Sequence, residues 1–220
     1  MLMRNRMRDE RGFSLVELLV VMILTGVIGG VVVAAVTSGF RTSATAESRI
    51  DAINDLQRGI QRIGRELRVA DPLVFQAAPL GDPQPAFSEE VRAEVERDGQ
   101  RTRYRYYLVD VGDGVAELRE DVQRLDGSGN VLSSNDGLFI ADVANLTTGT
   151  KLFSYYTTDL DTGELEEIPC DDATDQVCRD RHLTATQIEM RLEKLLPRQP
   201  PVQLQTIVNV RNTRFEEPSA

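Results

Sequence analysis

An uninterrupted apolar run near the N-terminus is the feature that most limits how this chain can fold. No residue between Leu18 and Val36 is charged, and a helix of about 24 residues counted from Phe13 would be about 36 Å long. The hydrocarbon core of a bilayer is about 30 Å thick, so such a helix can cross it. A buried core helix is the alternative, but core helices are rarely apolar on every side over this length. The sequence therefore predicts insertion in a membrane.

Charged residues are distributed unevenly along the chain. Residues 1–12 hold four of its 25 basic and two of its 35 acidic residues, so 21 basic and 33 acidic residues follow, a net charge of −12. By the positive-inside rule, the arginines before the apolar run place the N-terminus in the cytoplasm and the body outside. Because binding to nucleic acid requires cations that displace phosphate counterions, the acidic body predicts no nucleic-acid partner.

One carboxylate lies at the start of the inserting segment. Glu17 precedes the apolar run directly, and a charge within a membrane helix costs on the order of 2.5–3.5 kcal/mol on insertion scales. The residue therefore needs a partner, unless it lies at the membrane interface and is tolerated there.

The residues around Glu17 match a known processing signal. Residues 12–17 read Gly12-Phe13-Ser14-Leu15-Val16-Glu17, and with the basic leader before them they resemble the N-terminal signal of type IV prepilins and type II secretion pseudopilins. The resemblance implies that a prepilin peptidase cleaves between Gly12 and Phe13 and methylates the new amine of Phe13. It also implies that Glu17 pairs with that amine, in a neighbouring subunit during assembly, since opposite charges attract strongly at low dielectric.

A secretory signal peptide is the competing interpretation of the N-terminus. Ala44-Thr45-Ala46 resembles a small-residue cleavage site. The apolar run is longer than the roughly 7–15 residues of such signals, and the alanines lie well beyond its end. We therefore favour a retained helix over a secretory signal.

Three glycines lie within the apolar run. Gly26 and Gly30 have the GxxxG spacing that lets membrane helices approach closely. Glycine is also common in membrane helices without such a role. We interpret Gly26 and Gly30 as a helix-packing surface.

From Arg41 the apolar pattern becomes amphipathic. Apolar residues recur at steps of three and four, the period of one helix face: Ile50, Ile53, Leu56, Ile60, Ile63 and Leu67. Asp71-Pro72 ends the pattern. A free coiled coil is the alternative, but the stripe is short and lacks ordered flanking charge pairs. The sequence predicts one helix over 13–70 whose second half packs on a sheet.

Alternating patterns in the remaining chain predict a β-rich head. Expected strands are 101–109, 116–125, 138–143, 151–157, 165–168, 184–192 and 202–210. The last two are expected to be antiparallel neighbours connected by 197–201. The predicted fold is therefore α+β and type IV pilin-like, with a long N-terminal helix packed against an antiparallel sheet.

The chain is accordingly expected to have five parts. They are the leader 1–12, the membrane and assembly half of the helix 13–40, its amphipathic half 41–72, the extracytoplasmic head 73–216 and the tail 217–220. The head resembles minor pilins of the W type and minor pseudopilins of the J type. That resemblance rests on Tyr104-Arg105-Tyr106-Tyr107-Leu108, Leu118-Arg119 and Val210-Arg211-Asn212, and on the paired strands 184–192 and 202–210.

Two cysteines lie close together in the head. Seven residues separate Cys170 from Cys178, and outside the cytoplasm this spacing suggests a loop-closing disulfide. The chain-entropy model gives such a bond about 2–3 kcal/mol of stabilisation.

No motif for catalysis is present in the sequence. There is no HExxH, GxSxG, P-loop or dinucleotide glycine pattern, and His182 is the only histidine. We therefore predict no enzyme, no catalytic residue, no metal site and no cofactor, and place His182 in a loop or at a strand edge.

Calcium is the one ion that the acidic loops suggest. Asp126, Ser128 and Asn130 begin like an EF-hand loop, but Val131 stands where glycine is required and Gly137 where glutamate is. A second acidic group consists of Asp171, Asp172 and Asp175. These residues could gather around a cation, but we favour the interpretation that they are solvated surface acids.

The resemblance implies a structural role in a filament. Expected partners are prepilin peptidase, other pilin or pseudopilin subunits, the inner-membrane assembly platform and, before assembly, the lipid bilayer. The expected location is the bacterial inner membrane, in a single pass, and then a pilus or pseudopilus. A minor pilin near the tip is preferred, and a type II secretion pseudopilin is the alternative. A membrane protein with an extracytoplasmic receptor or enzyme domain would instead retain residues 1–12, and a DNA-uptake pilin conflicts with the acidic charge.

Overall fold

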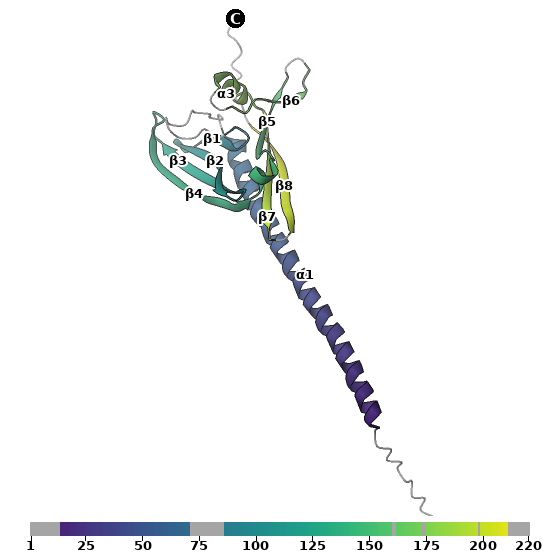
Figure 1. The fold of residues 1–220 in the computed structure, drawn as a ribbon. Helices are drawn as coiled ribbons and strands as arrows, with labels where there is room; N and C mark the ends of the chain where they lie inside the picture. The colour runs from purple at the N-terminus through teal and green to yellow at the C-terminus, as the bar shows by residue number, and fades with distance from the viewer. Residues whose placement is uncertain (1–13, 71–85, 160–161, 173–174, 198, 211–220) are drawn as a thin grey trace, which may run out of the picture. The chain divides into compact units, whose positions relative to one another are not determined.

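The structure, a computed structural model, describes residues 14–70, 86–159, 162–172, 175–197 and 199–210 (Figure 1). The chain divides into two compact units, residues 1–47 and 48–220, and one helix, α1 (Leu15–Val69), begins in the first and ends in the second. The predicted long helix is therefore confirmed. Phe13 and Asp71-Pro72, its expected limits, lie outside the described residues.

The second half of α1 buries most of the predicted apolar stripe. Leu56, Ile63 and Leu67 are each 0% exposed and belong to the core of the head. Ile50 is an exception, because the buried face of the helix begins only at Ala52, and its side chain is 57% exposed. The prediction of a helix packed on a sheet, and not of a free coiled coil, is thus confirmed.

Within the described residues, eight strands form one antiparallel sheet, which confirms the α+β class. In chain order they are β1 (Glu90–Arg97), β2 (Gln100–Gly112), β3 (Val115–Leu125), β4 (Val131–Val143), β5 (Phe153–Thr158), β6 (Leu165–Glu167), β7 (Gln187–Leu196) and β8 (Gln199–Asn209). Two short helices, α2 (Asn145–Thr148) and α3 (Gln176–His182), lie between strands. The sheet order is β1-β2-β3-β4-β7-β5-β6, and β8 also pairs with β7.

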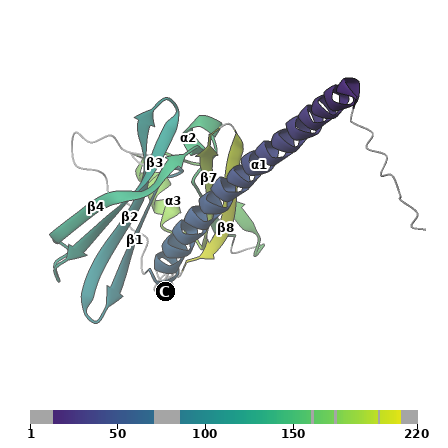
Figure 2. The same ribbon diagram turned by 90° about the horizontal axis from the view of Figure 1, so that it is seen from below.

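The sheet consists of two half-sheets, β1–β4 and β5–β8, which meet at one seam. A single ladder pairing, Val143 with Lys194, joins β4 to β7. Next to it the N–H of Ala144 donates to the carbonyl of Glu193 at 2.8 Å. Asn145 is 1% exposed, and its side-chain oxygen accepts from the N–H of Glu193 at 2.9 Å. In Figure 2 the strands β1–β4 and β7–β8 form two separate groups.

All seven predicted strands are present with changed ends. β4 begins at Val131 because Asp126 closes a tight turn before it, accepting from the N–H groups of Ser128 and Asn130 at 2.8 Å each. β7 and β8 are antiparallel neighbours, as predicted. β8 already begins at Gln199, so the connection is shorter than expected.

Candidate functional site

The first half of α1 presents apolar side chains on all sides. It is long and apolar enough to cross a membrane, and none of its most apolar window is buried within the chain. Leu15 is 81% exposed and Ile28 63%. A surface of this kind is stable in lipid or against other apolar helices. The segment therefore fits a single membrane crossing, and it is equally suited to the interior of a helical assembly.

Glu17 lies in the first turn of α1 with its side chain exposed. The helix N-terminus favours a negative charge there. Within the described part of the chain, no hydrogen bond or ion pair reaches its carboxylate. Gly12 and Phe13 lie outside that part, so cleavage between them and pairing of Glu17 with the Phe13 amine stay predictions.

Gly26 and Gly30 leave an open surface on α1. Apart from the adjoining residues and the backbone of the same helix turns, no atom lies within 4 Å of the position that a Cβ would take at either glycine. Their packing role therefore stays a prediction, which only a second helix could fulfil. Further along the helix the hydroxyl of Thr37 donates to the carbonyl of Val33 at 2.8 Å, so this polar group is satisfied without water.

The outer face of β1 and β2 carries a ladder of ion pairs. Glu90 and Glu94 on β1 are 5% and 4% exposed. Arg105 donates to Glu90 at 2.9 Å, Arg103 donates to Glu94 at 2.6 Å, and Arg101 also contacts Glu94. Because arginines hold both carboxylates, these acids serve to join two strands.

Sequence reasoning missed β1, although a signal for it is present. Val91, Ala93 and Val95 alternate with charged residues in Glu90–Arg97, and all three are buried. Glu94 and Glu96 lie opposite Arg103 and Arg101 on β2, whereas Arg92 lies opposite Arg105. Opposite charges on two neighbouring alternating segments would have identified this hairpin.

The predicted disulfide between Cys170 and Cys178 is present, with Cα atoms 5.8 Å apart. Beside it His182 ends α3, is 1% exposed and stacks on Phe87 with ring centroids 3.8 Å apart. The prediction of a loop or strand edge for His182 is therefore wrong, because α3 was not recognised. Burial lowers the pKa of His182 and so favours the neutral ring. Its Nδ1 lies 2.8 Å from the carbonyl oxygen of Cys178, so Nδ1 carries the proton and donates to that oxygen.

Three potential metal ligands meet at this corner of the head. The Sγ atoms of Cys170 and Cys178 and a ring nitrogen of His182 lie within 4.8 Å of one another. Metal binding by cysteine requires thiolates. Because both sulfurs are in the disulfide, the group stabilises the corner by packing and covalent linkage.

Two of the three acids considered for calcium, Asp171 and Asp175, bind groups of the protein itself. The carboxylate of Asp171 accepts from both the N–H and the hydroxyl of Ser88, each at 2.6 Å. Asp175 caps α3 by accepting from the N–H of Val177 at 2.9 Å. These contacts connect the disulfide loop to the segment before β1 and give Asp171 and Asp175 structural roles.

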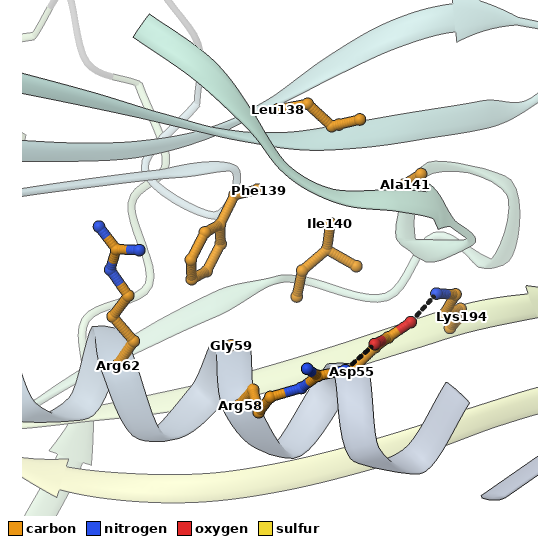
Figure 3. A pocket seen from close by; sticks show the side chains of 9 residues that line it. All are labelled: Asp55, Arg58, Gly59, Arg62, Leu138, Phe139, Ile140, Ala141 and Lys194. Atoms are coloured by element: carbon orange, nitrogen blue, oxygen red, sulfur yellow. Dashed lines mark hydrogen bonds and ion pairs between the residues drawn. The ribbon is translucent and has the colours of Figure 1, made fainter. Parts of the chain in front are cut away.

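A groove of about 510 Å³ lies between the second half of α1 and β4 (Figure 3). It is lined by Asp55, Arg58, Gly59, Arg62, Leu138, Phe139, Ile140, Ala141 and Lys194. Asp55 accepts from Lys194 at 2.7 Å and from Arg58 at 2.6 Å. The hydrogen bond from Lys194 and the charges of both cations lower the pKa of Asp55. With three cations and one acid, the groove is basic within an acidic chain.

A β-bulge shapes the apolar wall of the groove. The register of β4 against β3 shifts between Leu138 and Ile140, and Phe139 and Ile140 both point toward α1 in Figure 3 while Leu138 points away. The guanidinium of Arg62 lies 5.4 Å from the ring centroid of Phe139. Sequence reasoning did not find this groove, because it depends on which strand edge the helix approaches.

Comparison with known families concerns the N-terminal segment. Residues 7–36 match the family described as the prokaryotic N-terminal methylation motif. The matched segment includes Gly12, Phe13 and Glu17, together with Gly26 and Gly30. No curated protein matches the chain. The match supports the resemblance of the N-terminal segment to type IV prepilins. It does not extend to the head, which is interpreted from its own structure.

Proposed function

We propose that this chain, a type IV prepilin-like protein, is a minor filament subunit that prepilin peptidase processes and that enters a type IV pilus at or near its tip to prime assembly. One observation supports this most. The methylation motif at 7–36 coincides with a helix half that is apolar on all sides and has Glu17 as its one charge between Leu15 and Phe40.

The proposed route uses the two ends of the apolar segment. Cleavage between Gly12 and Phe13 creates a cationic amine four residues before Glu17. A carboxylate and an amine at low dielectric stabilise each other, whereas either alone is penalised. Pairing between neighbouring subunits therefore sets their axial register. During assembly the apolar half of α1 would move from the lipid bilayer into a bundle of similar helices. Its side chains would therefore remain in apolar surroundings throughout.

The head supplies surface for protein contacts in this proposal, and no enzymatic reaction is assigned to it. Its partners are prepilin peptidase, the other pilin subunits and the inner-membrane assembly platform, with the lipid bilayer before assembly. The protein is first a single-pass inner-membrane protein with its head outside, and then part of the filament.

Intact mass and N-terminal sequencing test the proposal. The protein is isolated from membranes of cells with and without prepilin peptidase. We expect a chain that begins at Phe13 and carries one methyl group, only when the peptidase is present. A chain that begins at Met1 in both strains would refute the filament role and leave a membrane protein with an extracytoplasmic binding domain.

A minor pseudopilin of a type II secretion system is the alternative within the same class, because the methylation motif is common to both. Deletion of the gene distinguishes the two. Loss of surface pili with normal protein secretion supports the pilus, and loss of secretion with normal pili supports the pseudopilus.

A further inference from the structure

The edge of β4 beyond the seam is open. Only Val143 pairs with β7, since β5 takes the next positions of the same edge. Between Val131 and Ala141, the described residues provide β4 with a ladder on the β3 side alone. Leu132 is 66% exposed and Leu138 55%. An extended edge of this kind is a template for another strand.

The bulges of the open β4 edge lie toward its two ends, and between them residues 133–138 pair with β3 in unbroken register. Proline, lysine and arginine are absent from Val131–Val143. The other long edges of the sheet are protected. β8 contains Pro200 and Pro201, and β1 carries a charged side chain at every second position or more often, including Arg92 and Arg97. β4 is therefore the edge best suited to accept a strand.

The charge beside this edge selects an acidic partner. Arg58 and Arg62 both line the groove that runs along β4 (Figure 3). Each already pairs with one acid of its own chain, Arg58 with Asp55 at 2.6 Å and Arg62 with Glu120 at 2.7 Å, but their side chains are 76% and 51% exposed, so a partner's carboxylate can still reach them. Lys194 closes the groove at the seam. In a chain with net charge −10, such a basic groove complements the acidic surface that the same chain shows elsewhere.

β6 is the matching acidic edge. Glu164, Leu165, Glu166 and Glu167 are all exposed, with Leu165 50% exposed. Glu164 and Ile168 face β5, because the carbonyl of Glu164 accepts from Asp159 and the N–H of Ile168 donates to Tyr155. In an antiparallel ladder alternate residues face opposite edges, so the backbone groups of Leu165 and Glu167 face outward.

We propose that the β4 edge of one molecule binds the β6 edge of a second copy of this chain. Backbone hydrogen bonds extend the β1–β4 half-sheet by one strand, Glu164 and Glu166 approach the arginines of the groove, and Leu165 covers exposed apolar surface of β4. Because two different surfaces meet, the contact is head-to-tail and can repeat along a line without closing into a dimer. The contact between heads does not depend on the place of the subunit in a filament.

Cysteine cross-linking between full-length chains in membranes tests this contact. One tagged copy carries a cysteine at one of the positions 133–136 of β4, and a second, differently tagged copy carries Glu166→Cys. Opposed residues at non-hydrogen-bonded positions of paired strands lie about 4.5 Å apart at Cβ, which is the upper limit for a disulfide. We expect a mixed dimer from at least one position, and none when the β4 cysteine is replaced by Asp110→Cys at the exposed end of β2.

A charge exchange keeps the test independent of folding. Arg58→Glu in the β4 copy should lower the cross-linking yield roughly tenfold, and Glu164→Arg in the β6 copy should restore it. Arg49→Glu is the matched control, because nine residues along the helix place it on the opposite face of α1, and it should leave the yield unchanged.

Three outcomes would overturn the proposal. They are absence of a mixed dimer at every β4 position while both copies are in the membrane, cross-links between two β4 cysteines, and cross-links from β4 to a different protein only.

Discussion

At Gly59 the backbone of α1 lies directly against side chains of β4, and substitution there tests how the head is packed. A Cβ at this position would overlap Cδ1 of Ile140, and it would lie 3.4 Å from Cγ1 of Ile140 and 3.5 Å from Cε1 of Phe139. Replacing glycine by alanine within a helix gains about 1 kcal/mol in propensity. Overpacking a filled core costs about 1–3 kcal/mol. We therefore expect Gly59→Ala to destabilise the head by up to about 2 kcal/mol.

Removing Cδ1 of Ile140 should reverse the sign of this effect. Ile140→Val alone costs about 0.5–1.5 kcal/mol. In the Ile140→Val background the nearest atoms to the new methyl group are at ordinary contact distance, so Gly59→Ala should stabilise by about 0.5–1 kcal/mol. The coupling energy of the double-mutant cycle should then be about 1–3 kcal/mol.

Thermal unfolding of the full chain in detergent micelles, followed by near-UV circular dichroism of the tyrosines, measures the cycle. Each kcal/mol corresponds to about 2–4 °C in Tm for a domain of this size. Gly64→Ala is the matched control at a second buried glycine of α1, which faces β7 and β8 instead of β4; its Cβ would lie 3.4 Å from Val208 and 3.7 Å from Met190, so it should not destabilise. Equal effects of Gly59→Ala in both backgrounds would refute the packing of α1 against Ile140.

Three further outcomes are expected. Glu17→Gln should leave cleavage and methylation intact but reduce incorporation into filaments, because the charge that sets the register is lost. Immunoblotting of sheared pili measures incorporation, and a normal level would contradict the pairing role of Glu17. Joint replacement of Cys170 and Cys178 by serine should lower the free energy of unfolding by about 2–3 kcal/mol, measured by urea denaturation, and an unchanged midpoint would contradict it. Burial raises the pKa of all five tyrosines, that of Tyr156 to about 12, so the folded state holds these protons more tightly than the unfolded state. The stabilisation that comes from these shifts is therefore fully present below about pH 10 and is lost as the pH rises through about 12. Tyrosinate absorbance should rise together with unfolding. Gradual titration near pH 10 in the folded state would contradict this.

Much of the fold could be predicted because its patterns are local. The apolar run from Leu18 and the stripe from Ile53 to Leu67 each follow from spacing along the chain, and so do the strands that alternate cleanly. β1 was missed because its outward residues are charged and its inward residues include only valine and alanine. α3 was missed because a capped helix of seven residues, which starts inside the disulfide loop and ends at His182, is too short to show a periodicity.

The processing signal and the disulfide could be predicted, since both depend on residues that are close in sequence. The groove could not, because Asp55 and Lys194 lie far apart in the chain and meet only through the seam between β4 and β7. His182 illustrates the same limit. Its burial follows from stacking on Phe87, and nothing in its sequence neighbourhood indicates that contact.

The seam between the half-sheets also has a consequence for the order of folding. β1 to β4 form a meander in which each strand pairs with its predecessor, so its contacts are local and their loop-closure entropy is small. Pairing of Val143 with Lys194 joins residues far apart in sequence and requires β7 to be in place first. Because contacts between distant residues form slowly, we expect the meander to be structured early and the seam, with Asn145, to be completed last.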